Sequence, residues 1–218
     1  MERLRVGDRL EPQAEIALTA SLLEQVAGGE RGRTLRVARP APTAAFGRLD
    51  ARRPGFPAAR ARAVAHGLTP VIRAAGGHAV AYDEGSVVVQ LFHPEPTWPT
   101  PIERRYGELT DRVVADLGGL GVPVELGELP DEYCAGRFSL HLPDGPKVAG
   151  LAQRALRRAS LTAAIVVVEA SDALRQAVIE IYAALELPLD PATVGGIRDR
   201  HPEVTPEAVI DALMTASR

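Results

Sequence analysis

Two runs rich in β-branched residues constrain the fold of this 218-residue chain more than any other feature. Residues 86–92 read Ser-Val-Val-Val-Gln-Leu-Phe, and residues 161–169 carry Ile-Val-Val-Val. Short runs of this kind are typical of strands buried inside a sheet. Further strands are predicted over residues 34–38, 69–74, 79–82, 138–142 and 147–156. The sequence therefore predicts a sheet of several strands with a buried centre.

Helices are predicted before, between and after these strands. The apolar spacing predicts helices over residues 12–27 and 102–117, each followed by a Gly-Gly pair at which it ends. Two more are predicted over residues 172–186 and 205–216, and the proline-rich residues 93–101 are predicted to form a loop. Strands grouped with helices around them indicate an α/β (α+β) fold. We expect one mixed-sheet domain flanked by helices over residues 1–187, with a small helical extension packed on it over residues 188–218.

The composition limits the classes of function. A net charge of -3 and an aromatic content of 4% argue against a general nucleic-acid binder. No apolar run approaches the roughly 20 residues of a membrane helix, and the first residues do not resemble a signal peptide. A single Cys and scattered His residues argue against a metal site and fit a reducing compartment. We expect a cytoplasmic protein with no metal, nucleic-acid or membrane partner.

The chain has one Lys and one Cys, and they lie close together in the sequence. Among 25 basic residues only Lys147 is a Lys, which suggests a position where Arg would not serve. Cys134 precedes it by one predicted strand and a tight turn. A cation beside the thiol would favour the nucleophilic thiolate. The alternative interpretations are a Lys retained by chance and an inert, buried thiol.

Residues 31–62 are strongly basic, with nine Arg against one acid, Asp50. One interpretation is a solvated surface. The other is a docking surface for an acidic partner protein.

Two stretches, residues 72–85 and 133–154, together resemble the biotin/lipoate protein ligase and lipoyl/octanoyl transferase superfamily. The first is similar to its Arg-x-x-Gly-Gly loop, which is followed by a strand and an Asp. The second contains a Lys-Val-Ala-Gly-x-Ala-Gln strand of the same superfamily. The matching residues are Arg73, Gly76, Gly77, Asp83, Lys147, Gly150 and Gln153.

A cysteine motif narrows the resemblance to one branch. Tyr133, Cys134, Gly136, Arg137 and Phe138 are similar to the motif of the octanoyl-[H protein] amidotransferases. The resemblance implies an acyltransferase that moves an octanoyl or lipoyl group through a Cys134 thioester onto a lysine of a lipoyl domain. Lys147 would orient the acyl carbonyl and keep Cys134 ionised.

The resemblance also implies the remaining parts of the site. Residues expected to bind the acyl substrate are Arg73, Gly76, Gly77, His78, Asp83, Gly136, Gly150 and Gln153. No cofactor is expected beyond the acyl group. The expected partners are acidic lipoyl domains, namely the glycine cleavage H protein and the acyltransferase subunits of 2-oxo acid dehydrogenases.

Some positions depart from the superfamily pattern. Ala75 stands where Ser or Thr is frequent, His78 where ligases have a third Gly, Ala135 where Pro is frequent and Ser139 where Asp is frequent. Two alternatives stay open. One is an ATP-dependent lipoate–protein ligase, in which Lys147 contacts the acyl-adenylate. The other is a non-catalytic module that binds acyl groups or lipoyl domains.

Overall fold

A large mixed sheet forms the centre of the computed structural model, which describes residues 1–6, 9–95 and 101–215. Its seven strands lie in the order β1-β2-β6-β10-β9-β8-β7. They are β1 (Glu2–Val6), β2 (Thr34–Ala38), β6 (Ser86–Pro94), β10 (Ala159–Val167), β9 (Lys147–Ala155), β8 (Leu140–His141) and β7 (Glu125–Leu126). Only β1 and β2 pair in parallel. The two β-branched runs lie side by side, because β10 pairs with β6 along its whole length.

A second, three-stranded sheet lies beside the first. It consists of β4 (Thr69–Ile72), β3 (Thr43–Phe46) and β5 (Val80–Tyr82), in that order. The sequence predicted one sheet, and the strand at β3 was not predicted. This small sheet carries the Gly76-Gly77 loop, which connects β4 to β5.

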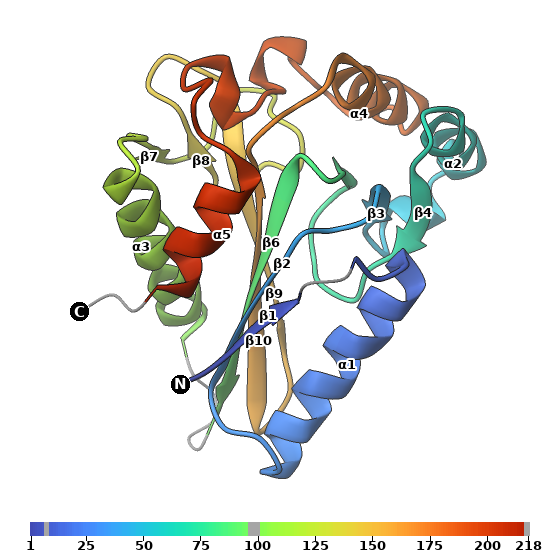
Figure 1. Ribbon diagram of the computed structural model, residues 1–218. Helices are drawn as coiled ribbons and strands as arrows, with labels where there is room; N and C mark the ends of the chain where they lie inside the picture. Colours follow the sequence, from blue (N-terminus) through green and yellow to red (C-terminus); the bar gives the residue numbers. More distant parts are fainter. Residues whose placement is uncertain (7–8, 96–100, 216–218) are drawn as a thin grey trace.

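Of five α-helices in the described residues, three lie on the two faces of the large sheet and two lie beside the small sheet (Figure 1). They are α1 (Pro12–Gly28), α2 (Phe56–Ala65), α3 (Ile102–Gly119), α4 (Asp172–Ala184) and α5 (Pro206–Met214). Helices α3 and α5 contact each other on one face, and α1 crosses β6 and β10 on the other. Helices α2 and α4 pack together beside the small sheet. The predicted mixed α/β fold is confirmed, with α2 as an unpredicted helix.

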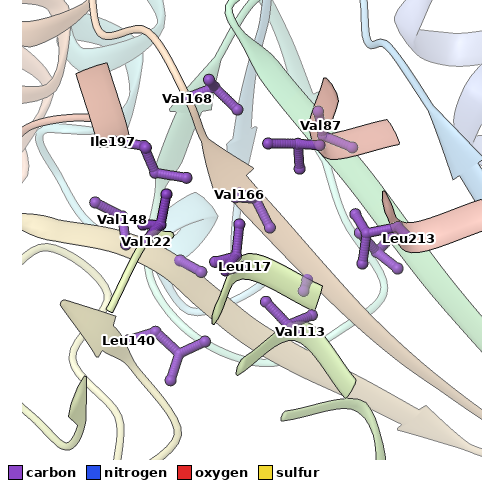
Figure 2. Packing of buried hydrophobic residues seen from close by; sticks show 14 of the residues in the cluster. Val87, Val113, Leu117, Val122, Leu140, Val148, Val166, Val168, Ile197 and Leu213 are labelled. Atoms are coloured by element: carbon purple, nitrogen blue, oxygen red, sulfur yellow. The ribbon is translucent and has the colours of Figure 1, made fainter. Parts of the chain in front are cut away.

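The main hydrophobic core fills the space between the large sheet and the α3–α5 layer (Figure 2). Val113 and Leu117 of α3 pack there against Val87 and Val166 of the central strands. Segments beyond residue 187 belong to the same core, which contains Ile197, Val204, Val209 and Leu213. The predicted boundary between residues 187 and 188 stays a prediction.

The end of β6 and the apolar character of the helices also bear on the sequence predictions. Strand β6 extends to Pro94, so the predicted proline-rich loop begins later, and residues 96–100 of it lie outside the described residues. None of the helices in the described residues is long and apolar enough to cross a membrane.

Candidate active site

A cavity of about 230 Å³ lies between α1 and the large sheet. Its walls are mostly apolar and small. They include Ile16, Thr19, Ala20 and Leu23 of α1, Val88 and Gln90 of β6, Gly150, Leu151 and Ala152 of β9, and Ala163, Ile165 and Val167 of β10. The C-terminal half of α1 rests on the sheet through Leu22, Val26 and Phe92. Small residues along the rest of the interface leave space that suits a flexible apolar chain.

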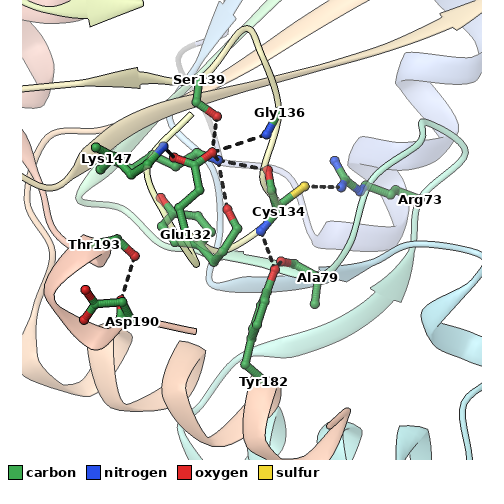
Figure 3. Close-up of polar contacts among 12 residues, drawn as sticks. Arg73, Ala79, Glu132, Cys134, Gly136, Ser139, Lys147, Tyr182, Asp190 and Thr193 are labelled. Atoms are coloured by element: carbon green, nitrogen blue, oxygen red, sulfur yellow. Dashed lines mark hydrogen bonds and ion pairs between the residues drawn. The ribbon is translucent and has the colours of Figure 1, made fainter. Parts of the chain in front are cut away.

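Cys134 lines this cavity from the loop that precedes β8. Its φ of 46° lies in the left-handed region, which is strained for a residue other than Gly. The loop is held there by Tyr182 of α4, because the Cys134 N–H donates to Tyr182 Oη at 2.5 Å (Figure 3). Tyr182 Oη in turn donates to the carbonyl of Ala79 at 3.0 Å. The strained conformation is therefore stabilised by a contact from a distant helix.

Arg73 and Gly77 surround the Cys134 sulfur. Arg73 Nη2 lies 3.4 Å from Cys134 Sγ and donates to the carbonyl of His78 at 2.7 Å. A Cβ added to Gly77 would lie 2.7 Å from Sγ, and the φ of Gly77 is +93°. Gly76 and Gly77 are exposed, so the sulfur lies between the cavity and the molecular surface. The Arg73 guanidinium therefore places positive charge directly beside the sulfur.

Lys147 contacts the Cys134 loop through its backbone. Its Nζ donates to Glu132 Oε1 at 3.0 Å and to the carbonyl oxygens of Tyr133 and Cys134 at 2.8 and 2.9 Å. The expected contact between Lys147 and the sulfur is not made, and Arg73 makes it instead. Burial lowers the pKa of Lys147 from its ordinary value, while Glu132 acts in the opposite direction. Three acceptors converge on one point, a geometry that suits a compact ammonium better than a planar guanidinium.

Glu132 is a site residue that the sequence reasoning missed. Its side chain is fully buried, and Oε1 also accepts hydrogen bonds from the Gly136 N–H and from Ser139 Oγ. It thereby ties both ends of the Cys134 loop to Lys147. The only sequence signal is an acid two residues before the lone Cys. Tyr182, 48 residues after Cys134, has no sequence signal.

The residues that follow Cys134 attach its loop to α3. The rings of Phe138 and Tyr106 stack with centroids 4.5 Å apart, and the Arg137 guanidinium lies 4.9 Å from the Phe138 centroid. Burial raises the pKa of Tyr106. The conformation of this loop therefore depends on α3 as well as on α4.

The predicted acyl-binding residues occupy several different positions relative to the cavity. Arg73 and Gly150 line the cavity together with Cys134 and Lys147. Gly150 lies beside Lys147, because a Cβ added there would come within 3.2 Å of Lys147 Cε. Gly76, Gly77 and Gly136 belong to the loops around Cys134.

Asp83 and Gln153 do not line the cavity. Asp83 accepts from the Gly85 N–H at 2.9 Å in the turn between β5 and β6, and burial raises its pKa. Gln153 accepts from Arg105 Nε of α3 at 2.7 Å, on the opposite face of the sheet from α1. Their expected role in acyl binding stays a prediction that this geometry does not support.

His78 follows Gly77 and pairs with Asp50. His78 Nδ1 lies 2.7 Å from Asp50 Oδ1, and Asp50 Oδ2 accepts from the Gly47 N–H at 2.9 Å. The Asp50 side chain is 0% exposed and that of His78 is 38% exposed. Asp50 was noted in the sequence only as the single acid of a basic segment.

The basic segment of residues 31–62 is largely neutralised within the molecule. Five of its Arg residues pair with acids elsewhere in the chain, namely Arg31, Arg33, Arg36, Arg39 and Arg62. Arg48 and Arg52 are exposed and form no ion pair with the described residues. They follow Gly47, whose added Cβ would lie 2.0 Å from the Gly77 carbonyl oxygen. The segment that begins at Gly47 therefore adjoins the Gly76-Gly77 loop, which lies beside Cys134. No three His, Cys, Asp or Glu of the described chain lie close enough to hold a metal ion.

Comparisons of this sequence with known proteins all indicate the same family. A family model described as lipoyl protein ligase A/B catalytic domain matches residues 11–218. The chain is 28% identical over 157 residues to the octanoyl-[GcvH]:protein N-octanoyltransferase of Geobacillus kaustophilus, covering 72% of this chain and 55% of that protein. The lipoyl-[GcvH]:protein N-lipoyltransferase of Listeria monocytogenes is 28% identical over 116 residues, covering 53% of this chain and 41% of that protein. The chain spans about half the length of the curated relatives it matches.

Solved structures share the fold. The crystal structure of a lipoate-protein ligase A bound with ATP superposes with a TM-score of 0.73 at 18% identity, covering 98% of this chain and 83% of that one. LipL1 of P. falciparum, solved in complex with lipoate, gives a TM-score of 0.69 at 13% identity, covering 97% of this chain and 60% of that one. The ligase-like architecture that the motifs indicated is thereby confirmed.

Proposed function

Because the chain belongs to the lipoyl protein ligase A/B catalytic domain family, we propose that it is an N-acyltransferase that transfers octanoyl or lipoyl groups to lipoyl-domain proteins. The observation that carries this proposal is the position of Cys134. Its sulfur lies beside the Arg73 guanidinium, at the border between an apolar cavity and the surface. The names of the relatives describe the same type of reaction.

The first step of the proposed reaction forms an acyl-enzyme. The Cys134 sulfur attacks the carbonyl carbon of an acyl group that is bound to a donor lysine through an amide. A C–S bond forms, the C–N bond breaks, and the donor amine leaves with the thiol proton. Arg73 places positive charge beside the attacking sulfur, and the cavity walls hold the apolar tail.

The second step transfers the acyl group to an acceptor. The unprotonated amine of the acceptor lysine attacks the thioester carbon, a C–N bond forms and the C–S bond breaks. The sulfur leaves as a thiolate beside the Arg73 guanidinium, and the proton that the attacking nitrogen loses passes to the sulfur or to solvent. Lys147 has a positioning role in this scheme, because it holds the carbonyl groups of Tyr133 and Cys134 in place.

The proposed partners are acidic lipoyl domains. The glycine cleavage H protein is the proposed donor, since the names of the relatives contain it. Acyltransferase subunits of 2-oxo acid dehydrogenases are the proposed acceptors. Arg48 and Arg52 provide exposed positive charge for such a partner, on the segment that adjoins the Gly76-Gly77 loop. The reducing cytoplasm, where a single thiol stays reduced, is the proposed compartment.

A reconstituted transfer without nucleotide tests the proposal. The protein is mixed with octanoylated H protein and an unmodified lipoyl domain, and the mass of the acceptor is followed. We expect the acceptor to gain one octanoyl group. Octanoylation that requires ATP and free octanoate, with release of pyrophosphate, would instead indicate a ligase. Tight binding of lipoyl domains without any acylation would indicate a non-catalytic module.

A further inference from the structure

The proposed second step needs a base that the described contacts do not assign. The amine of a lysine is mostly protonated at neutral pH, and an ammonium cannot attack a thioester. Lys147 is fully buried and uses its three N–H groups on Glu132, Tyr133 and Cys134. The Arg73 guanidinium stays protonated and has no acceptor atom. The proton of the acceptor amine must therefore go to another group.

The Asp50–His78 pair has the arrangement of a base held by a carboxylate. Asp50 is buried, and its Oδ2 is fixed by the Gly47 N–H, so that Oδ1 faces His78 Nδ1 at 2.7 Å. A carboxylate only accepts hydrogen bonds, so the proton of the neutral imidazole lies on Nδ1 and Nε2 is left as the basic nitrogen. Nε2 forms no hydrogen bond or ion pair with the described residues, whereas Nδ1 is paired with Asp50. The His78 side chain is 38% exposed, so an incoming substrate can reach it.

The residues on both sides of His78 contact the surroundings of Cys134. Before it, the position of a Gly77 Cβ lies 2.7 Å from Cys134 Sγ. After it, the Ala79 carbonyl accepts from Tyr182 Oη, which itself accepts from the Cys134 N–H. The carbonyl of His78 and the sulfur of Cys134 share one donor, Arg73 Nη2. These three contacts place the backbone of residues 77–79 beside the Cys134 sulfur and its loop.

We propose that His78, held by Asp50, is the general base of the second half-reaction, an assignment that rests on the proposed acyltransferase function. His78 Nε2 takes one proton from the acceptor ammonium. The resulting amine attacks the thioester carbon, the C–N bond forms, and the C–S bond breaks to release the Cys134 thiolate. The second proton lost by the nitrogen passes to solvent or to the sulfur. The charged or titratable groups around His78 are Asp50, Arg73, Cys134 and Tyr182.

His78→Gln provides the direct test, because the two half-reactions can be measured separately. Acyl-enzyme formation from octanoylated H protein is followed first, by the mass of the protein. The acyl-enzyme is then discharged either by the acceptor lipoyl domain or by hydroxylamine. Hydroxylamine is already unprotonated at neutral pH and needs no base. His66→Gln is the matched control, since His66 also pairs with a carboxylate, Glu180, but lies at the end of α2.

The proposal predicts that only one of the three rates changes in His78→Gln. In His78→Gln, acyl-enzyme formation and hydroxylamine discharge stay near the wild-type rates, while discharge by the acceptor slows about 100-fold, the typical contribution of a general base. Asp50→Asn slows the same step, and His66→Gln changes none. Equal discharge by the acceptor in His78→Gln and wild type overturns the proposal, as does an equal loss of all three rates. Absence of any acyl-enzyme in the wild type would overturn the proposed function itself.

Discussion

At the residue scale, the reactivity of Cys134 depends on what touches its sulfur. The sequence places Cys134 and Lys147 in one motif, yet in the structure the cation at the sulfur is Arg73. Lys147 instead fixes the backbone that carries the thiol. Spacing alone cannot distinguish these arrangements, because the partner of the sulfur depends on the conformation of the loop, in which Cys134 has a φ of 46°.

Substitution of Gly77 tests the contact between Arg73 and the Cys134 sulfur. In Gly77→Ala the new Cβ would lie 2.7 Å from Sγ and 2.8 Å from Arg73 Nη2, so both groups must move. We expect acyl-enzyme formation to fall about 100-fold, because a shift near 1 Å is enough for such a loss. The measurement is the rate at which the enzyme mass increases with an octanoylated donor. Gly76→Ala is the matched control, since nothing lies within 4 Å of its added Cβ, and equal rates in both variants would contradict the account.

At the scale of elements, the sequence predicts those helices and strands whose residues form a strong apolar pattern. Strands β6 and β10 and helices α1, α3, α4 and α5 follow the predicted ranges within a few residues. Helix α2 and strand β3 were missed because they bury mainly alanines. Ala59 and Ala63 are the buried residues of α2, and Ala44 and Ala45 occupy the middle of β3. Small side chains carry little hydrophobic signal, so only the tertiary structure determines these elements.

The residues of the candidate site were likewise predicted in part. Arg73, Gly77 and Cys134 were identified from their motifs and do meet in space. Glu132 and Tyr182 were missed, because their roles depend on buried contacts between the Cys134 loop, β9 and α4. Such long-range polar contacts leave no periodic pattern in a single sequence.

The buried Lys147–Glu132 pair joins β9 to the Cys134 loop, and its removal has a predictable effect. Lys147→Met leaves the fully buried Glu132 without its cation. We expect the free energy of unfolding to fall by about 3–5 kcal/mol. Chemical denaturation measures this change. The double variant Lys147→Met/Glu132→Leu should recover much of the stability, and a single-variant loss below about 1 kcal/mol would contradict a structural role for the pair.

We expect the cavity between α1 and β10 to limit the length of the acyl chain that the protein accepts. Ala163 of β10 lines the cavity, so Ala163→Leu fills part of it. We expect octanoyl transfer to fall about 10-fold relative to butanoyl transfer, since pockets discriminate by roughly this factor per added group. Competition between the two acyl donors measures the ratio. Ala115→Leu on the exposed face of α3 is the control, and an unchanged ratio in Ala163→Leu would show that the chain binds elsewhere.

At the scale of the whole molecule, the tyrosines report on the integrity of the fold. The chain has four tyrosines, and burial raises the pKa of each one, that of Tyr82 to about 12. A Tyr that stays neutral in the folded state contributes stability below its unfolded pKa of 10.0. That contribution is lost as the pH rises from 10.0 toward the folded pKa of about 12.

Titration of the protein to alkaline pH tests the burial of these tyrosines. The free energy of unfolding should decrease steadily above about pH 10, and tyrosinate absorbance should rise together with the loss of helical circular dichroism. Absorbance and stability are measured on the same samples. Full ionisation of the four tyrosines near their ordinary pKa, with the fold intact, would contradict their burial.

The central claim is that Cys134 carries the acyl group between donor and acceptor. Intact-mass spectrometry of the protein after mixing with octanoylated H protein tests it most directly. We predict that the wild type gains the mass of one octanoyl group, that hydroxylamine removes it, and that Cys134→Ser gains none under the same conditions. A wild-type protein that transfers octanoyl groups without this adduct, or an adduct that persists in Cys134→Ser, would contradict the account.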